Sequence, residues 1–163
     1  ISSAASDVYK RQSVNKEPVA KGAAAVLAVD DSTLTWEIKR LYFVDDAPVA
    51  LSRYTIPAAM VPDLDQRDLH ESIMEVLAGY NLKPAFTREN LSAATARMEE
   101  QKLLQVSRSH PLLRFVRLLK DETGRAIAYI EASLRSDIVN VEVIMGDEPA
   151  PEPSTSRGAG ENT

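Results

Sequence analysis

The chain contains no cysteine and very little histidine: His70 and His110 are the only two among 163 residues. The lack of cysteine excludes disulfide bonds and thiolate chemistry. The two histidines lie far apart in the sequence and have no carboxylate pattern around them. We therefore expect no metal site and interpret both histidines as surface residues.

An excess of basic residues is also missing, as is any long hydrophobic run. The formal net charge is -5, and residues 146–163 hold four acidic residues and one arginine, which accounts for -3 of it. A nucleic-acid module usually presents a basic face, so we expect no direct DNA or RNA binding by this stretch. No run approaches the ~20 apolar residues of a membrane span, and the composition is ordinary for a soluble globular protein.

Catalytic motifs are scarce. The sequence has no glycine-rich phosphate loop, no nucleophile elbow, no histidine-based general base and no paired thiols. We therefore expect neither a classical enzyme nor a bound cofactor.

The most informative stretch that is present runs from Trp36 to Pro57 and predicts a β-hairpin. Aromatic and β-branched residues continue to Val44, Asp45-Asp46-Ala47 is a polar turn, and an alternating apolar pattern follows. Arg40 and Arg53 lie among apolar neighbours, one on each strand, where two guanidinium groups could bind an anion. The commoner alternative places each arginine on the exposed face of a half-buried sheet, and the hairpin alone favours that alternative.

The rest of the chain predicts a mixture of helices and strands in one domain, given its length. Helical spacing follows Pro18 and recurs at 69–79, where Asp65 or Asp68 would cap the helix and Gly79 would end it. The remaining expected elements are a strand at 85–96, a helix at 97–106, a second hairpin at 111–137 and a strand at 138–145. Five or six strands, mostly in hairpins, with two or three helices predict an α+β fold with an antiparallel sheet.

The two ends of the chain differ from this pattern. Residues 1–12, ISSAASDVYKRQ, resemble a translated sequencing adapter, so we expect residues 1–16 to be a non-native or disordered leader. The domain would then extend over residues 17–145. Residues 146–163 have no apolar content to bury, which predicts a disordered tail.

Strand-borne polar groups are the candidates for binding. If the two hairpins face one cleft, Arg40, Arg53 and Arg135 would bind an anionic group, while Glu131 would accept hydrogen bonds from hydroxyl or amine groups of the same ligand. A plain surface ion pair between Glu131 and Arg135, four apart on one strand, is the alternative. Thr87 and Arg88 are equally consistent with ordinary surface residues.

Taken in order along the chain, several short motifs resemble those of the UTRA domain, the ligand-sensing part of HutC-subgroup regulators of the GntR type. The motifs on which the resemblance rests are Arg40-Leu41-Tyr42 with Asp45, Pro48 to Leu51, Ile56-Pro57, Ser72 to Leu77 with Tyr80, Leu103 to Val106, Pro111 to Arg117, Asp121 to Ile127, and Glu131 to Asp137. Together they extend from about Val19 to Met145.

The resemblance implies a chorismate-lyase-like fold, a small-molecule effector, a homodimer and a cytoplasmic regulator. It assigns phosphate contacts to Arg40, Thr87 and Arg88, a sugar contact to Glu131, and a structural or ligand role to Arg135. Tyr42 and Ser52 stand where many relatives have arginine and glutamate, so a carboxylate, amine or phosphonate effector is as well supported as a sugar phosphate.

The same family places a winged-helix DNA-binding domain before the sensor, and nothing in this sequence resembles one. We therefore expect DNA binding only through such an absent domain. We also expect the strand that usually precedes the first helix to be lost or replaced by the adapter-like segment, which would leave an edge of the sheet open. Two alternatives stay open: a free-standing lyase of the chorismate-lyase type, in which Glu131 acts in proton transfer, and a dimerisation module without a ligand.

Overall fold

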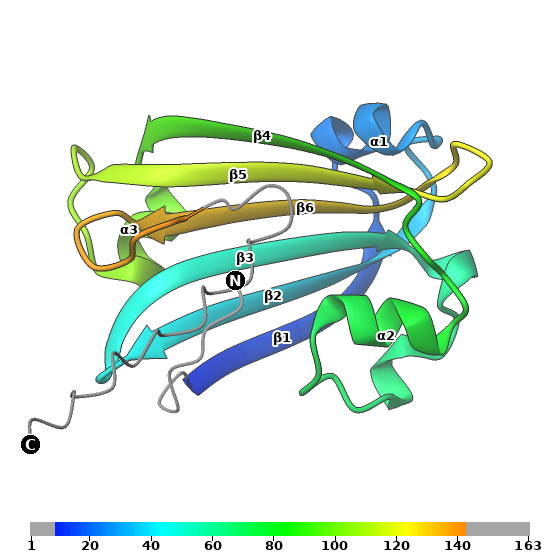
Figure 1. The fold of residues 1–163 in the computed structure, drawn as a ribbon, viewed down its shortest axis with the longest axis horizontal. Coiled ribbons are helices and arrows are strands. Elements are labelled where there is room, and N and C mark those ends of the chain that lie inside the picture. The colour runs from blue at the N-terminus through cyan, green and yellow to red at the C-terminus, as the bar shows by residue number, and fades with distance from the viewer. Residues whose placement is uncertain (1–8, 143–163) are drawn as a thin grey trace, which may run out of the picture.

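The computed structural model describes residues 9–142, which form one antiparallel sheet with helices on both faces (Figure 1). The strand order is β1-β2-β3-β6-β5-β4. The strands are β1 (Tyr9–Pro18), β2 (Leu34–Val44), β3 (Ala47–Pro57), β4 (Phe86–Thr95), β5 (Pro111–Lys120) and β6 (Ala126–Arg135). The helices are α1 (Lys21–Leu27), α2 (Ile73–Gly79) and α3 (Met98–Leu104), with 3-10 turns η1 (Ala58–Met60) and η2 (Leu64–Gln66). The predicted α+β class with an antiparallel sheet is confirmed.

Both predicted hairpins are present, and turn chemistry explains each of them. Asp45 and Asp46 adopt φ values of 47° and 62° between β2 and β3, the left-handed conformation that a tight hairpin turn requires. In the second hairpin the Asp121 carboxylate accepts hydrogen bonds from the backbone N–H groups of Thr123 and Arg125. Strands β3 and β6 then pair with each other, so the two hairpins meet at the centre of the sheet.

One face of the sheet, here named the α2 face, contains the largest core cluster. Trp36, Ile38 and Ile56 project from β2 and β3 and pack against Leu64 of η2 and Leu77 of α2. The Trp36 indole N–H donates to the Val61 carbonyl, which fixes the η1 and η2 segment over the strands. Helix α2 thereby covers one end of this face.

The opposite face, here named the α3 face, is covered at its two ends by α1 and α3 (Figure 1). Ala24 and Leu27 of α1 pack against Leu118 of β5. At the other end, Leu104 of α3 packs against the sheet together with Leu51 of β3. Between these two apolar patches the sheet presents polar side chains.

A strand does precede the first helix, and its first residues, 9–12, belong to the adapter-like segment. Of the two expected outcomes, the loss of this strand, with an open sheet edge, is therefore wrong. Strand β1 pairs with β2 along its whole length, from Tyr9 opposite Phe43 to Pro18 opposite Leu34, and Val14 packs against the main core. The boundary expected between residues 16 and 17 therefore lies inside β1. Polar side chains dominate this strand because it is an edge strand, whose order comes from the backbone ladder.

The strand expected at 138–145 is also wrong for residues 138–142. The N–H groups of Ile138 and Val139 both donate to the Arg135 carbonyl, so the backbone turns after β6. Val139 and Val141 pack against a small cluster that contains Leu134, which explains their apolar character without a strand. Residues 143–145 and the expected disordered tail, 146–163, lie outside the described residues.

The N-cap of α2 is Ser72 rather than Asp65 or Asp68. The Ser72 hydroxyl accepts from the Glu75 N–H, and the Glu75 carboxylate accepts from the Ser72 N–H, which together form a capping box. The helix ends at Gly79 as predicted. Within the described residues, no helix has the length and apolar character that crossing a membrane requires.

Candidate functional site

Three charged residues form a row across the central strands on the α3 face. Lys39 of β2 is the register partner of Arg53 of β3, and Arg53 is in turn the partner of Glu131 of β6. Partners in register lie on the same face of a sheet and close enough to interact. Arg53 therefore lies between a cation on one side and a carboxylate on the other.

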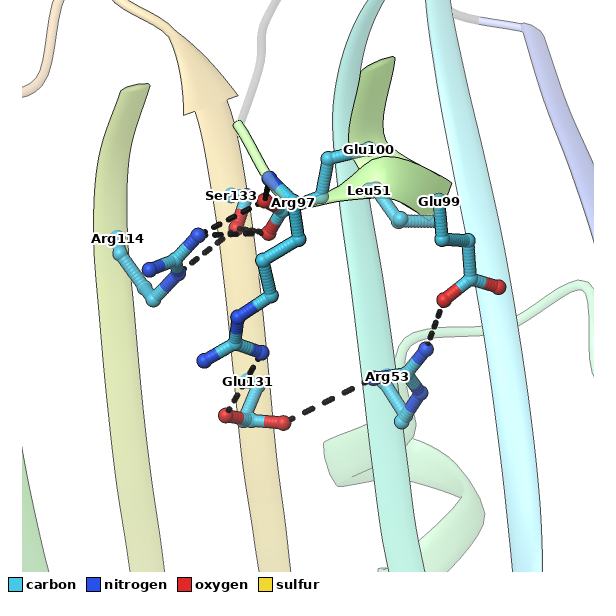
Figure 2. A pocket seen from close by; sticks show the side chains of 8 residues that line it. All are labelled: Leu51, Arg53, Arg97, Glu99, Glu100, Arg114, Glu131 and Ser133. Carbon is cyan, nitrogen blue, oxygen red and sulfur yellow. Dashed lines mark hydrogen bonds and ion pairs between the residues drawn. The ribbon is translucent and has the colours of Figure 1, made fainter. Parts of the chain in front are cut away.

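Arg97, the N-cap of α3, and Glu99, in its first turn, add two more charges beside Arg53 and Glu131 (Figure 2). The Glu99 carboxylate bridges the row, with Oε1 2.5 Å from Lys39 Nζ and Oε2 2.5 Å from Arg53 Nη2. Arg97 reaches the other end, where its Nη1 lies 3.7 Å from Glu131 Oε1. The Arg53 to Glu131 ion pair, at 3.8 Å, is longer than a hydrogen bond. Glu131 also interacts with Tyr129, whose pKa is raised by burial and by the charge and hydrogen bonding of Glu131.

A second, buried cluster holds α3 against the sheet. Glu100, 6% exposed, accepts hydrogen bonds from Arg114 Nη2, from the Ser133 hydroxyl and from the Arg97 backbone N–H. Burial opposes ionisation of Glu100, but the hydrogen bonds from Ser133, Arg97 and Arg114 keep its pKa below the usual value. This cluster of Glu100, Arg114 and Ser133, here named the Glu100 anchor, forms the floor of the site.

These charged groups surround a small cavity of about 50 Å3. The residues that line it come from β3, α3 with the residue before it, β5 and β6: Leu51, Arg53, Arg97, Glu99, Glu100, Arg114, Glu131 and Ser133. Small-molecule pockets have volumes of roughly 300–1,000 Å3. The side chains that now bind one another must therefore separate before a metabolite can enter.

Two of the residues proposed from the sequence, Arg53 and Glu131, come together in this cavity. The expectation that the hairpins would bring an arginine of the first and the glutamate of the second to one place is confirmed for this pair. Arg40 is not part of the site, and the expectation that it converges with Glu131 is wrong. Its register partner is Ser52, the neighbour of Arg53, and successive residues of a strand face opposite sides of the sheet.

Arg40 lies on the α2 face, where it is 2% exposed. Its Nε donates to the Gln12 side chain and its Nη2 donates to the Leu69 carbonyl at 2.7 Å. The guanidinium also lies over the Tyr54 ring. These contacts tie β1 and the segment before α2 to the sheet, which is a structural role.

Thr87 and Arg88 are exposed on the edge strand β4 and face opposite sides of the sheet. Thr87 is the register partner of Leu119, and Arg88 is the partner of Leu118. Arg88 shares the α3 face with Glu131, but it is two strands away and does not line the cavity.

Arg135 lies beyond the cavity, at the end of β6. Its Nη2 is 2.8 Å from Asp137, which also contacts His110. The hydrogen bond from Arg135 lowers the pKa of Asp137 to about 2. The alternative of a plain Glu131 to Arg135 ion pair does not hold: among the described residues Glu131 pairs with Arg53 and Arg97, and Arg135 pairs with Asp137.

Sequence reasoning missed most of the cavity, including the cations Arg97 and Arg114 and the acids Glu99 and Glu100. It also missed Lys39, which lies beside the cavity and binds Glu99. One signal was available: Glu37 and Lys39 alternate with apolar residues on β2, so both had to share a face. Nothing local indicated which arginine of β3 or which helix they would meet.

The arrangement is suited to binding an anion. Guanidinium and ammonium groups bind carboxylates and phosphates through charge-assisted hydrogen bonds, and the Glu131 carboxylate can accept from a hydroxyl or amine. No group of three or more acidic or histidine side chains suitable for a metal ion occurs among residues 9–142.

These features define a class of protein: an antiparallel α+β domain with a charged cavity beside its central strands. The UTRA domain family model matches residues 9–140, and the chain therefore belongs to the UTRA domain family. The match begins at the residue where β1 begins, in agreement with the strand found there.

The curated relatives are transcriptional regulators. The chain is 28% identical over 127 residues to the HTH-type transcriptional regulator GgaR of Escherichia coli strain K12, covering 77% of this chain and 50% of the relative. It is 24% identical over 115 residues to the HTH-type transcriptional repressor NagR of Bacillus subtilis, covering 70% of this chain and 47% of the relative. The chain thus spans about half the length of these relatives.

Solved structures confirm the fold. A GntR-family transcriptional regulator from Bacillus cereus superposes with a TM-score of 0.79 at 17% identity, covering 86% of this chain and 100% of that one. PhnF from Mycobacterium smegmatis gives a TM-score of 0.75 at 19% identity, covering 86% of this chain and 64% of that one. The fold is that of the effector domains of GntR-type regulators, which is chorismate-lyase-like.

Proposed function

We propose that this chain is the effector-binding domain of a bacterial transcriptional regulator of the HutC subgroup, and that a small anionic effector binds at the cavity on the α3 face. The effector's anionic group contacts Arg53 and Lys39, and its hydroxyl or amine groups contact Glu131. DNA binding belongs to a preceding winged-helix domain of the whole regulator, which acts in the cytoplasm.

The observation that supports this proposal most directly is the convergence of charges on one cavity. Arg53, Arg97 and Arg114 line it from two strands and from the residue before α3, and the carboxylates of Glu99, Glu100 and Glu131 lie between them. Lys39 binds Glu99 from the neighbouring strand β2. Arginine on rigid strands is well suited to holding a carboxylate or a phosphate.

The relatives support the regulatory part of the proposal. GgaR and NagR are described as HTH-type regulators, and this chain covers about half of each, which leaves room for a DNA-binding domain in the whole protein. The C-terminal domain of a histidine utilization repressor from Pseudomonas syringae is among the structural neighbours, with a TM-score of 0.74, which supports the HutC subgroup.

We further propose that the domain forms a homodimer. What supports it is an apolar patch on the α2 face, at the end of the sheet that α2 leaves uncovered. Tyr42, Val44 and Phe115 are only partly buried there, and the exposed Leu91 of β4 is the register partner of Phe115. Contiguous exposed apolar patches mark interaction sites.

No observation favours the lyase alternative, because the curated relatives are regulators. The alternative of a dimerisation module without a ligand predicts no charged cavity between the hairpins, in contrast to the site described above.

The test is a thermal-shift screen with sugar phosphates, amino acids and phosphonates, followed by calorimetry on the compound that stabilises the wild-type chain most. Replacing Arg53 by Met should weaken binding of that compound by at least about tenfold, because one charge-assisted contact is lost.

Arg117→Met is the matched control. Arg117 is also an arginine in an ion pair, with Glu89, but it lies on β5 outside the cavity, so the variant should bind as the wild type does. If Arg53→Met binds the compound as tightly as the wild type, the proposed site is wrong.

A further inference from the structure

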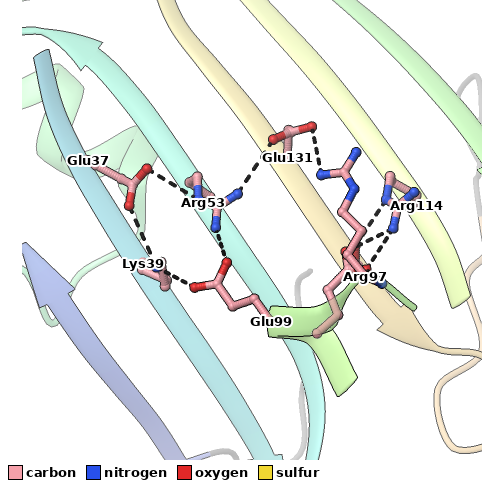
Figure 3. Close-up of polar contacts among 9 residues, drawn as sticks. Glu37, Lys39, Arg53, Arg97, Glu99, Arg114 and Glu131 are labelled. Atoms are coloured by element: carbon pink, nitrogen blue, oxygen red, sulfur yellow. Dashed lines mark hydrogen bonds and ion pairs between the residues drawn. The ribbon is translucent and has the colours of Figure 1, made fainter. Parts of the chain in front are cut away.

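Lys39 and Arg53 are two cations placed directly opposite each other on neighbouring strands. Like charges in register destabilise a sheet unless anions compensate them. Two carboxylates do so here: Glu37, which precedes Lys39 on the same face of β2, and Glu99, which reaches down from α3 (Figure 3).

The two carboxylates are held differently. Glu37 belongs to the sheet, its side chain is 19% exposed, and its oxygens lie 3.3 Å from Arg53 Nε and 3.7 Å from Lys39 Nζ. Glu99 is 43% exposed, and each of its oxygens contacts one of the two cations. Burial disfavours the ionised form of Glu99, but the hydrogen bond from Lys39 and the charge of Arg53 lower its pKa, so Glu99 is an anion at neutral pH.

The Glu99 side chain can separate from Lys39 and Arg53 without a movement of helix α3. The neighbouring Glu100 is buried and bound by Arg114 and Ser133, so the Glu100 anchor keeps α3 in place while the Glu99 side chain rotates into solvent. Exposed ion pairs contribute little to stability, so the loss of these contacts does not oppose the rotation strongly.

The size of the cavity requires such a movement. A volume of about 50 Å3 holds a few water molecules, whereas a metabolite needs several times more space. Among the lining ion-pair residues, the most exposed side chains are Arg97 at 55% and Glu99 at 43%. Of these two, only Glu99 has the charge of the expected ligand group.

We infer that Lys39 and Arg53 form an anion subsite whose occupant in this structure is the Glu99 carboxylate, and that a carboxylate, phosphate or phosphonate group of the effector binds there by replacing Glu99. This inference rests on the proposed function. It adds the position at which the anionic group binds and identifies the Glu99 carboxylate as an intramolecular competitor for that position. The observed affinity for the effector then depends on how much more strongly Lys39 and Arg53 bind its anionic group than they bind the Glu99 carboxylate.

The test uses inorganic phosphate as the probe and the full chain at pH 7 and constant ionic strength, with amide chemical shifts recorded by NMR. Glu99→Gln removes the competing charge, so phosphate should bind at least about tenfold more tightly than to the wild type, with the largest shifts at Lys39 and Arg53. Glu99→Ala, a second variant, should show the same gain.

Glu89→Gln is the matched control, because Glu89 also pairs with an arginine but lies outside the cavity. It makes the same change in net charge and should leave phosphate affinity unchanged. Adding Lys39→Met to the Glu99→Gln chain should abolish the gain.

Equal phosphate affinity of the wild type and both Glu99 variants overturns the inference, as does an equal gain in Glu89→Gln. The proposed function is tested separately: if Arg53→Met weakens binding of the screened compound while the Glu99 variants show no gain, the effector site stands and only the role of Glu99 is wrong.

Discussion

At the scale of single residues, Arg40 and Arg53 show how strand parity separates two similar side chains. Both are arginines flanked by apolar residues in the first hairpin. Arg53 faces α3 and belongs to a network of exposed and half-buried ion pairs, whereas Arg40 faces α2 and is almost completely buried. The same residue type therefore serves the cavity in one case and the core in the other.

Replacing Arg40 by Met should lower the free energy of unfolding by about 1–3 kcal/mol, because the buried Leu69 carbonyl loses this charged donor. Guanidinium denaturation measures the change, and Arg117→Met again provides a surface control. Affinity for the compound found in the screen should change less than twofold. A tenfold loss of affinity with unchanged stability would contradict this structural role and show that Arg40 contributes to ligand binding.

At the scale of elements, the helices are too short to be stable alone. Each of α1, α2 and α3 has seven residues, and isolated helices of this length do not form in water. Their order comes from capping and from packing on the sheet. For α3 the decisive contact is the Glu100 anchor, which fixes the turn that carries Arg97 and Glu99.

For α2 the decisive local feature is the capping box of Ser72 and Glu75. Ser72→Ala should lower the free energy of unfolding by about 1 kcal/mol, since the Glu75 N–H loses its acceptor. Asp65→Ala, at the exposed cap position suggested by the sequence, should change it by less than about 0.5 kcal/mol. Urea denaturation of both variants decides between the two caps, and the reverse order of effects would contradict the assignment.

At the scale of the whole molecule, one sheet separates two surfaces with different roles. The α3 face bears the charged cavity, and the α2 face bears the main core at one end and a partly exposed apolar patch at the other. Ligand binding and dimerisation are therefore proposed on opposite sides of the same strands. A shift in the central strands upon effector binding would reach both surfaces.

Strand β4 offers a matched pair of variants for the proposed dimer. Leu91 and Phe86 are both exposed and apolar, but Leu91 faces the apolar patch and Phe86 faces the other side of the sheet. Leu91→Glu should raise the dimer dissociation constant by at least about tenfold, because a charge is then desolvated in the interface. Sedimentation velocity over a concentration series measures this, and Phe86→Glu should remain as dimeric as the wild type. Equal behaviour of the two variants would place the dimer interface elsewhere.

Local patterns in the sequence already determined most of the elements. Asp45-Asp46 and Asp121 to Gly124 set the two turns, and apolar alternation set the strands beside them, so both hairpins were predictable. The strand expected at 138–145 is wrong for residues 138–142, because Val139 and Val141 pack against a cluster without extending the ladder. Strand β1 was missed for the opposite reason. Its sequence is polar and lacks the apolar alternation of a strand, and it is ordered by backbone pairing with β2.

The sequence by itself thus determined the α+β class, the hairpins and the family motifs, since these depend on turn chemistry and on neighbours a few residues apart. Only the tertiary structure decided which charges meet. Glu99 lies 46 residues from Arg53 in the chain, and their contact depends on the pairing of β3 with β6 and on the position of α3 above them. A shift of one residue in that register would have turned Arg53 into the core and Ser52 toward the cavity, and no local pattern specifies a register between strands so far apart.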